Sequence, residues 1–136
     1  MAGKSNYLEG QLLNLIFRTQ VAWKPTSVHV ALFTAAPTDA GGGTEVSGNA
    51  YARVPVTQAD AQWAAPSGTP RQTSNVNPIN FATPTPSGWG TVTHFGIYDQ
   101  LSGGNLLYWG ALAQSKVINA GDTVTFGAGQ LTVQED

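Results

Sequence analysis

The clearest periodic pattern of apolar positions lies near the beginning of the chain. In SNYLEGQLLNLIFRTQVAW, residues 5–23, apolar side chains recur at i, i+4, i+7 and i+8, at Leu8, Leu12, Leu15 and Ile16. This spacing places them on one face of an α-helix. A helix of this length is not stable alone in water, so its apolar stripe must lie on a sheet or on a partner chain. We therefore expect the helix to dock through Leu8, Leu12 and Ile16.

Local signals predict where this helix begins and ends. Asn6 is followed three residues later by Glu9, which is a variant of the capping box with Asn6 as the N-cap. Pro25 prevents continuation, so the helix is expected to end near Ala22. The pattern divides the chain into an N-terminal helical segment, residues 1–24, and a second part, residues 27–134.

The second part carries short runs typical of β-strands, separated by Gly, Pro, Asn and Asp. Residues 35–49 and the stretch after Trp63 have the composition of loops. Strands are expected at 27–34, 51–57, weakly around Trp63, 75–82, 89–99, 106–112, 115–119, 120–130 and 131–134. About eight short strands with frequent turns predict a mainly β fold, a β-sandwich or jelly roll, with the helix across one end or face. We expect residues 1–136 to form a single domain.

Two residues within these strands carry further information. Pro55 cannot donate a backbone hydrogen bond, so the strand at 51–57 is expected at a sheet edge. Gly96 stands in the middle of WGTVTHFGIYD and indicates either a bulge or close packing by a neighbouring aromatic ring. The segment 93–112 is expected to form a hairpin around the Ser-Gly-Gly-Asn turn.

Composition argues against some classes of function. Charged residues make up 10% of the chain, against about 25% in ordinary domains, and the net charge is −2. A nucleic-acid-binding protein needs a basic patch, and the six Lys and Arg are scattered. The sequence contains no cysteine, no recognisable signal peptide and no long apolar run, so neither a disulfide nor a membrane span is expected.

His94 is the obvious catalytic candidate, with Asp99 or Asp122 to orient it, but a histidine alone does not make an active site. The sequence lacks a Gly-x-Ser-x-Gly elbow and a phosphate-binding loop. His29 and His94 lack further ligands at the spacing of a zinc site, and the loop 39–45 lacks the alternation of a calcium loop. We therefore predict no enzymatic activity, no catalytic residue, no cofactor, no metal and no small-molecule substrate.

Aromatic residues are the other candidates for function. They could form a sugar-binding platform, or they could be anchors of the core and of a subunit interface. The second interpretation suits a β protein with four tryptophans better. The candidate interface residues, with His94 included, are Trp63, Trp89, His94, Tyr98, Tyr108 and Trp109.

Three segments together resemble a known family. These are VHVALFTAAPTDAGGGTEVSGNAYARVPV (28–56), WGTVTHFGIYDQLSGGNLLYWGAL (89–112) and INAGDTVTF (118–126). In this order and spacing they resemble the small structural proteins of tailed bacteriophages that are usually labelled tail fibre proteins, over about residues 28–133. The resemblance implies a non-enzymatic component of the virion, on the outer surface of head or tail, made in the cytoplasm of the bacterial host.

The resemblance alone does not fix the place in the virion. A fibre that reads the host normally needs a shaft of heptads, triple-β repeats or collagen-like sequence, and none is present. We therefore predict a capsid decoration, or cement, protein that stabilises the head by bridging capsomers. Its partners would be itself, as a dimer or trimer, and the major capsid protein. The alternatives are a tail fibre or tail-associated protein involved in host attachment, and a carbohydrate-binding β-sandwich module.

Overall fold

A computed structural model describes residues 2–19 and 23–135, and the structural statements below concern these residues. They form one helix and ten strands. In chain order the elements are β1 (Ala2–Lys4), α1 (Asn6–Phe17), β2 (Val28–Ala35), β3 (Thr44–Glu45), β4 (Val54–Val56), β5 (Arg71–Ser74), β6 (Ile79–Asn80), β7 (Gly90–Tyr98), β8 (Leu106–Ile118), β9 (Thr125–Phe126) and β10 (Thr132–Glu135). The predicted β-sandwich class with one N-terminal helix is confirmed. The more specific jelly-roll topology stays a prediction.

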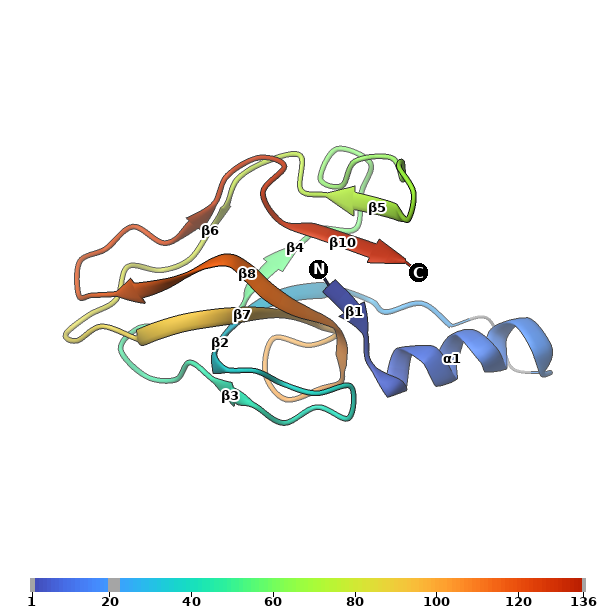
Figure 1. Ribbon diagram of the computed structural model, residues 1–136, viewed down its shortest axis with the longest axis horizontal. Coiled ribbons are helices and arrows are strands. Elements are labelled where there is room, and N and C mark those ends of the chain that lie inside the picture. The colour runs from blue at the N-terminus through green and yellow to red at the C-terminus, as the bar shows by residue number, and fades with distance from the viewer. Residues whose placement is uncertain (1, 20–22, 136) are drawn as a thin grey trace.

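The strands form one large sheet and two small ones, all antiparallel. The large sheet has the order β1-β8-β7-β2-β3, and β4 pairs with β2 beside β3. Two separate pairs, β5 with β10 and β6 with β9, form the second layer. Figure 1 shows β5, β6 and β10 on one side of the long strands β7 and β8. Among the described strands β4 pairs with β2 alone, so Pro55 lies at a sheet edge, as predicted.

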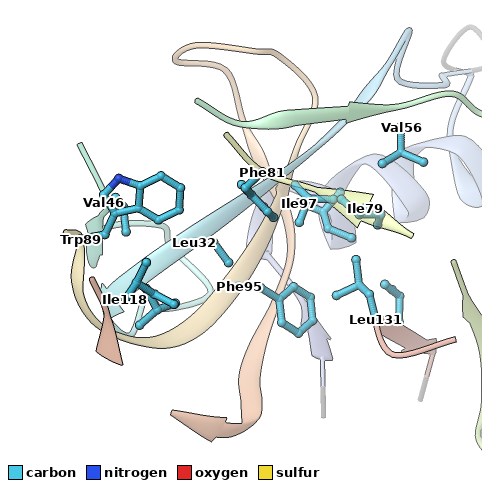
Figure 2. Close-up of a cluster of buried hydrophobic side chains, with 13 residues drawn as sticks. Leu32, Val46, Val56, Ile79, Phe81, Trp89, Phe95, Ile97, Ile118 and Leu131 are labelled. Atoms are coloured by element: carbon cyan, nitrogen blue, oxygen red, sulfur yellow. The ribbon is translucent and has the colours of Figure 1, made fainter. Parts of the chain in front are cut away.

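The hydrophobic core lies between these two layers (Figure 2). Alternate residues of β2 and β7 point into it because successive side chains of a strand face opposite sides of the sheet. Each large apolar side chain removed from water stabilises the fold by about 1.5–3 kcal/mol. The core residues are Val30, Leu32, Val46, Val56, Ile79, Phe81, Trp89, Val92, Phe95, Ile97, Ile118, Leu131 and Val133.

Gly96 lies where the chain needs a residue without a side chain. A Cβ at this position would lie 2.8 Å from Cε2 of Phe33 and 3.0 Å from Cδ1 of Leu106. The neighbouring aromatic ring expected from the sequence is therefore that of Phe33. The β7–β8 pairing also has register shifts, one between Val92 and His94 and one between Ile97 and Tyr98.

The helix differs from its predicted bounds at both ends. Its N-cap is Ser5 and not Asn6, because the Ser5 hydroxyl accepts the Leu8 N–H at 3.2 Å and donates to the Leu106 carbonyl at 2.5 Å. It ends at Phe17. The stripe would continue at residues 19 and 20, which are Thr and Gln, so no apolar residue is available to hold another turn. The predicted end at Ala22 lies outside the described residues.

The strand predictions need four corrections. Residues 106–112 and 115–119 were expected as two strands, but β8 runs through both, with the polar residues Gln114–Lys116 exposed. Strand β5 has the sequence RQTS and lacks the apolar alternation by which strands are predicted. Around Trp63 there is only a single bridge to Asn75, and the expected strand at 120–130 shortens to the two residues of β9.

Candidate functional site

The six candidate interface residues do not form one surface. Trp89 is a core residue, and its indole Nε1 donates to the Asn49 carbonyl at 3.0 Å, so its prediction as an interface residue is wrong. The large indole ring fills the space between the two layers and satisfies its only polar group there. The other five are half-buried and fall into two groups, one on each side of the large sheet.

The first group lies on the face of the sheet that points away from the core. His94 of β7 and Trp109 of β8 have ring centroids 6.1 Å apart. The Trp109 indole donates to Oδ1 of Asp39 at 2.9 Å, and Nδ1 of His94 contacts the Thr93 hydroxyl at 2.8 Å. These contacts attach the loop after β2 to the sheet. They give His94 an aromatic and a hydroxyl neighbour, and its role at an interface stays a prediction.

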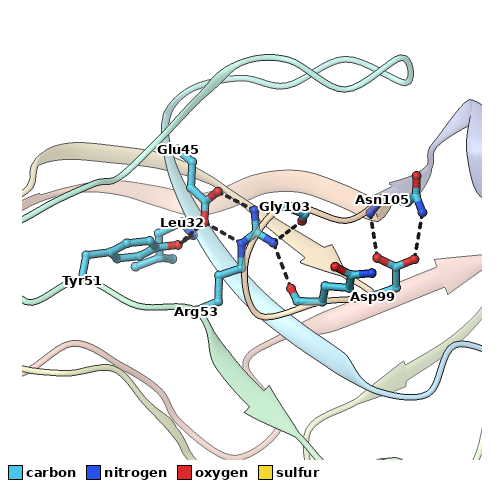
Figure 3. A network of polar contacts seen from close by, with 8 residues as sticks. Leu32, Glu45, Tyr51, Arg53, Asp99, Gly103 and Asn105 are labelled. Atoms are coloured by element: carbon cyan, nitrogen blue, oxygen red, sulfur yellow. Dashed lines mark hydrogen bonds and ion pairs between the residues drawn. The ribbon is translucent and has the colours of Figure 1, made fainter.

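Tyr98 belongs to the same face and leads to a network that the sequence did not reveal (Figure 3). The guanidinium of Arg53 lies 3.6 Å from the centre of the Tyr98 ring. Its Nε and Nη2 donate to the two carboxylate oxygens of Glu45, each at 2.8 Å. Its Nη1 donates to the carbonyls of Gln100 at 2.9 Å and Gly103 at 2.7 Å. The Arg53 side chain is buried, so these bonds are shielded from water.

The network shifts the ionisation of its members. Burial alone would lower the pKa of Arg53, but the hydrogen bonds and the negative charge of Glu45 raise it above its ordinary value. Burial also raises the pKa of the Tyr51 hydroxyl, which donates to Glu45 at 2.8 Å and accepts the Leu32 N–H at 3.0 Å. Arg53 is therefore held as a cation and Tyr51 as a neutral donor. Arg53 therefore joins β3, the residues before β4 and the 99–105 turn, and we call its contacts with Glu45, Gln100 and Gly103 the Arg53 clamp.

Asp99 closes this turn by a second set of bonds. Its carboxylate accepts the backbone N–H of Asn105 at 2.7 Å and the Asn105 amide at 3.0 Å (Figure 3). Asp99 is thus engaged with the turn, whereas His94 contacts Thr93, so Asp99 is not the carboxylate that would orient a catalytic His94. Together with the Arg53 clamp, these bonds fix the tip of the β7–β8 hairpin.

His29, beside the clamp, is the most enclosed histidine. Burial, and then the charge of Arg53, lower its pKa from the ordinary value. Its Nε2 lies 2.7 Å from the Ser27 hydroxyl, but that hydroxyl donates to the Asp99 carbonyl at 3.2 Å. The hydroxyl therefore accepts from Nε2–H, which is the wrong direction for activating a nucleophile. Within the described residues Nδ1 has no partner to orient the ring.

The second group lies at the other side, beside α1. Trp63 and Tyr108 line an apolar hollow of about 330 Å³ together with Leu8, Trp23 and Pro25. The Tyr108 hydroxyl donates to Glu135, and burial raises the pKa of Tyr108. Glu135 also accepts from Lys4 at 2.5 Å. The structure thus brings Leu8, Trp63 and Tyr108, predicted separately as docking and interface residues, to one place.

The helix itself extends away from the sheets (Figure 1). Leu8 is buried, Leu12 is half-buried and Ile16 is exposed. The expectation that all three dock on the sheet of the same chain is therefore wrong for Ile16, because only the first turn of α1 lies against β8. Docking on a partner chain, the other possibility, stays a prediction.

Residues 2–19 and 23–135 contain neither a cluster suited to a metal ion nor a helix that could span a membrane. No group of three or more His, Asp or Glu side chains within these ranges lies in an arrangement that could hold a metal ion. No helix among them is long and apolar enough to cross a membrane.

The clamp was missed at the sequence level, although a signal for it exists. Arg53 and Glu45 stand eight residues apart along the chain, and neither belongs to a recognised motif. Arg53 is one of only six basic residues, and it sits between Tyr51 and Val54 in a strand-like run. A lone charge among apolar strand residues indicates a buried partner, because an unpaired buried charge is very unfavourable.

Comparison with known proteins agrees with the resemblance. No curated protein gives a significant match to the chain. The family model described as "Podophage GP4 fiber I protein gp80" matches residues 3–134, which include both layers, the clamp and α1. A match over nearly the whole chain assigns the family and identifies a structural component of a phage virion. The chain therefore belongs to the family of the podophage GP4 fiber I protein gp80.

Proposed function

We propose that this protein is a tail fibre or tail-associated structural protein that takes part in attachment of the phage to its host. The observation that carries the proposal is the match of residues 3–134 to a fibre protein family. It favours the fibre alternative over the capsid decoration that we expected from the missing shaft. The absence of a shaft in this sequence does not weigh against a fibre whose shaft is another protein.

The geometry supports a role in presenting a surface. The 99–105 turn is held by Arg53 from one side and by Asp99 from the other, and Trp109 holds Asp39 in the loop after β2. Loops fixed on a rigid sheet lose little conformational entropy when they bind a target. Such loops are suited to a fixed contact, either with the host surface or with a neighbouring virion protein.

Deletion of the gene in an otherwise intact phage tests the proposal. A fibre predicts that the mutant particles keep the heat stability of the wild type but adsorb poorly to host cells, and that added purified protein or a complementing plasmid restores adsorption. A decoration protein predicts the reverse, because a protein that binds only the mature shell stabilises that shell. Normal adsorption together with loss of DNA at lower temperature would therefore replace the fibre interpretation with capsid decoration.

A further inference from the structure

The outer part of α1 leaves an apolar stripe in water. The exposed fraction rises along the helix, from 5% at Leu8 to 38% at Leu15, 67% at Ile16 and 77% at Phe17. Leu13, three residues before Ile16, is also exposed. Side chains three and four residues apart are neighbours on a helix, so Leu13, Ile16 and Phe17 form one patch, of about 400 Å². A patch of this size is in the range of the largest apolar patch on a typical monomer, which is often a functional surface.

The helix needs that patch to be covered. It has 12 residues, and within the described chain Leu8 is its only fully buried side chain. A helix this short is marginal in water unless an apolar face packs against other protein. The only charged residue of α1 is Glu9, in its first turn. The patch therefore carries no charge with which a charged partner could pair. When two copies of the patch meet, no like charges come together.

A complementary surface lies at the base of the same helix. The hollow of about 330 Å³ beside Leu8 is walled by Trp23, Pro25, Trp63 and Tyr108, and its lining is mostly apolar. Phe17 is nine residues beyond Leu8, which is about 13 Å along a helix. The exposed tip of α1 therefore cannot reach the hollow of its own chain, but the tip of another copy can.

We propose that two copies of the protein pair their α1 helices antiparallel, about a two-fold axis close to Leu12. In this arrangement Ile16 and Phe17 of each copy lie over the hollow beside Leu8 of the other. In antiparallel pairing, the tip of each helix contacts the base of the other helix. A parallel or three-fold arrangement would place the tips of the helices together and leave the hollows empty. The two patches and two hollows would bury about 1,200 Å² in total, the lower limit for a stable specific interface. This dimer does not depend on the place of the protein in the virion.

Cysteine cross-linking tests the geometry, and the chain has no cysteine of its own to interfere. Leu12→Cys should form a disulfide-linked dimer under mild oxidation, because the two copies of residue 12 face each other at the axis. Ile16→Cys should not, because its two copies would be separated by about 12 Å along the helices, beyond the reach of a disulfide. Cross-linking of Ile16→Cys, or none at Leu12→Cys, would overturn the antiparallel arrangement.

Association state tests the patch itself. Light scattering or sedimentation should give a dimer for the wild type and a monomer for Ile16→Asp, with thermal unfolding still cooperative because Ile16 is exposed in the single chain. The matched control is Val117→Asp, since Val117 is 62% exposed near the end of β8 that lies away from α1 (Figure 1), and this variant should stay dimeric. A monomeric or trimeric wild type, or an Ile16→Asp variant that remains a dimer, would refute the proposal.

Discussion

Removal of the buried guanidinium of Arg53 should destabilise the protein, because this group joins three segments of the chain. Arg53→Met keeps most of the aliphatic stem but deletes the guanidinium, and with it two bonds to Glu45 and two to the carbonyls of Gln100 and Gly103. The Glu45 carboxylate is then left without its countercharge. Breaking a buried ion pair from one side costs about 3–5 kcal/mol. Glu45 keeps 24% of its side-chain surface in water, so we expect the lower end, about 3 kcal/mol.

Urea unfolding followed by tryptophan fluorescence measures this loss, since Trp89 lies in the core. The free energy of unfolding should fall by about 3 kcal/mol with an unchanged denaturant slope. The variant Arg53→Met/Glu45→Leu removes both charges, and it should be less destabilised than the sum of the single variants, because neither partner is left unpaired. A loss below about 1 kcal/mol for Arg53→Met, the range of exposed ion pairs, would show that the clamp is not shielded from water.

Three further perturbations test other parts of the structure. Gly96→Ala should cost about 1–3 kcal/mol by thermal or urea unfolding, because its Cβ collides with the Phe33 ring, and Phe33→Leu in the same chain should recover part of that loss. Ser5→Ala should lower stability by about 1–2 kcal/mol, through loss of the cap and of the bond to the β8 carbonyl, whereas Asn6→Ala should change it little if Ser5 is the true N-cap. Burial and then Arg53 lower the pKa of His29 in the folded state, so the unfolded chain binds the proton more readily. Stability should therefore be full above about pH 6.5 and fall as the pH drops through that value, and a His29→Gln variant should show a smaller fall; an equal fall would assign the effect to other groups.

Periodicity predicted those elements whose burial is reflected in their own residues. Strand β2 is apolar on both faces because it is central in the sheet. Pro55 correctly predicted a sheet edge, and Gly96 correctly predicted close packing by an aromatic ring. Strand β5 could not be found in this way. Its sequence, RQTS, is polar, and its strand conformation depends on pairing with β10, which lies almost sixty residues further along the chain.

Prediction of the candidate site from the sequence was also limited by contacts that depend on tertiary structure. Aromatic residues were recognisable as anchors, but the sequence could not separate Trp89, which lies in the core, from Trp63 and Tyr108, which line a hollow beside α1. The clamp joins residue 45 to residue 53 and then to the turn near residue 103. Contacts of this kind depend on tertiary structure, so neither composition nor spacing reveals them.

The long strand β8 has a consequence for solubility. Among the described strands, its outer edge is paired with β1 only over residues 108–110, and residues 112–115 bulge opposite Thr93 alone. An open edge of this length is a template for aggregation, because its free backbone groups can pair with the same edge of another molecule. The bulge interrupts the ladder, and Lys116, the only charged residue in 111–118, stands on the exposed part. In a protein with few charges, we expect this lysine and this bulge to hinder neighbouring copies from joining into a continuous sheet when they are crowded together.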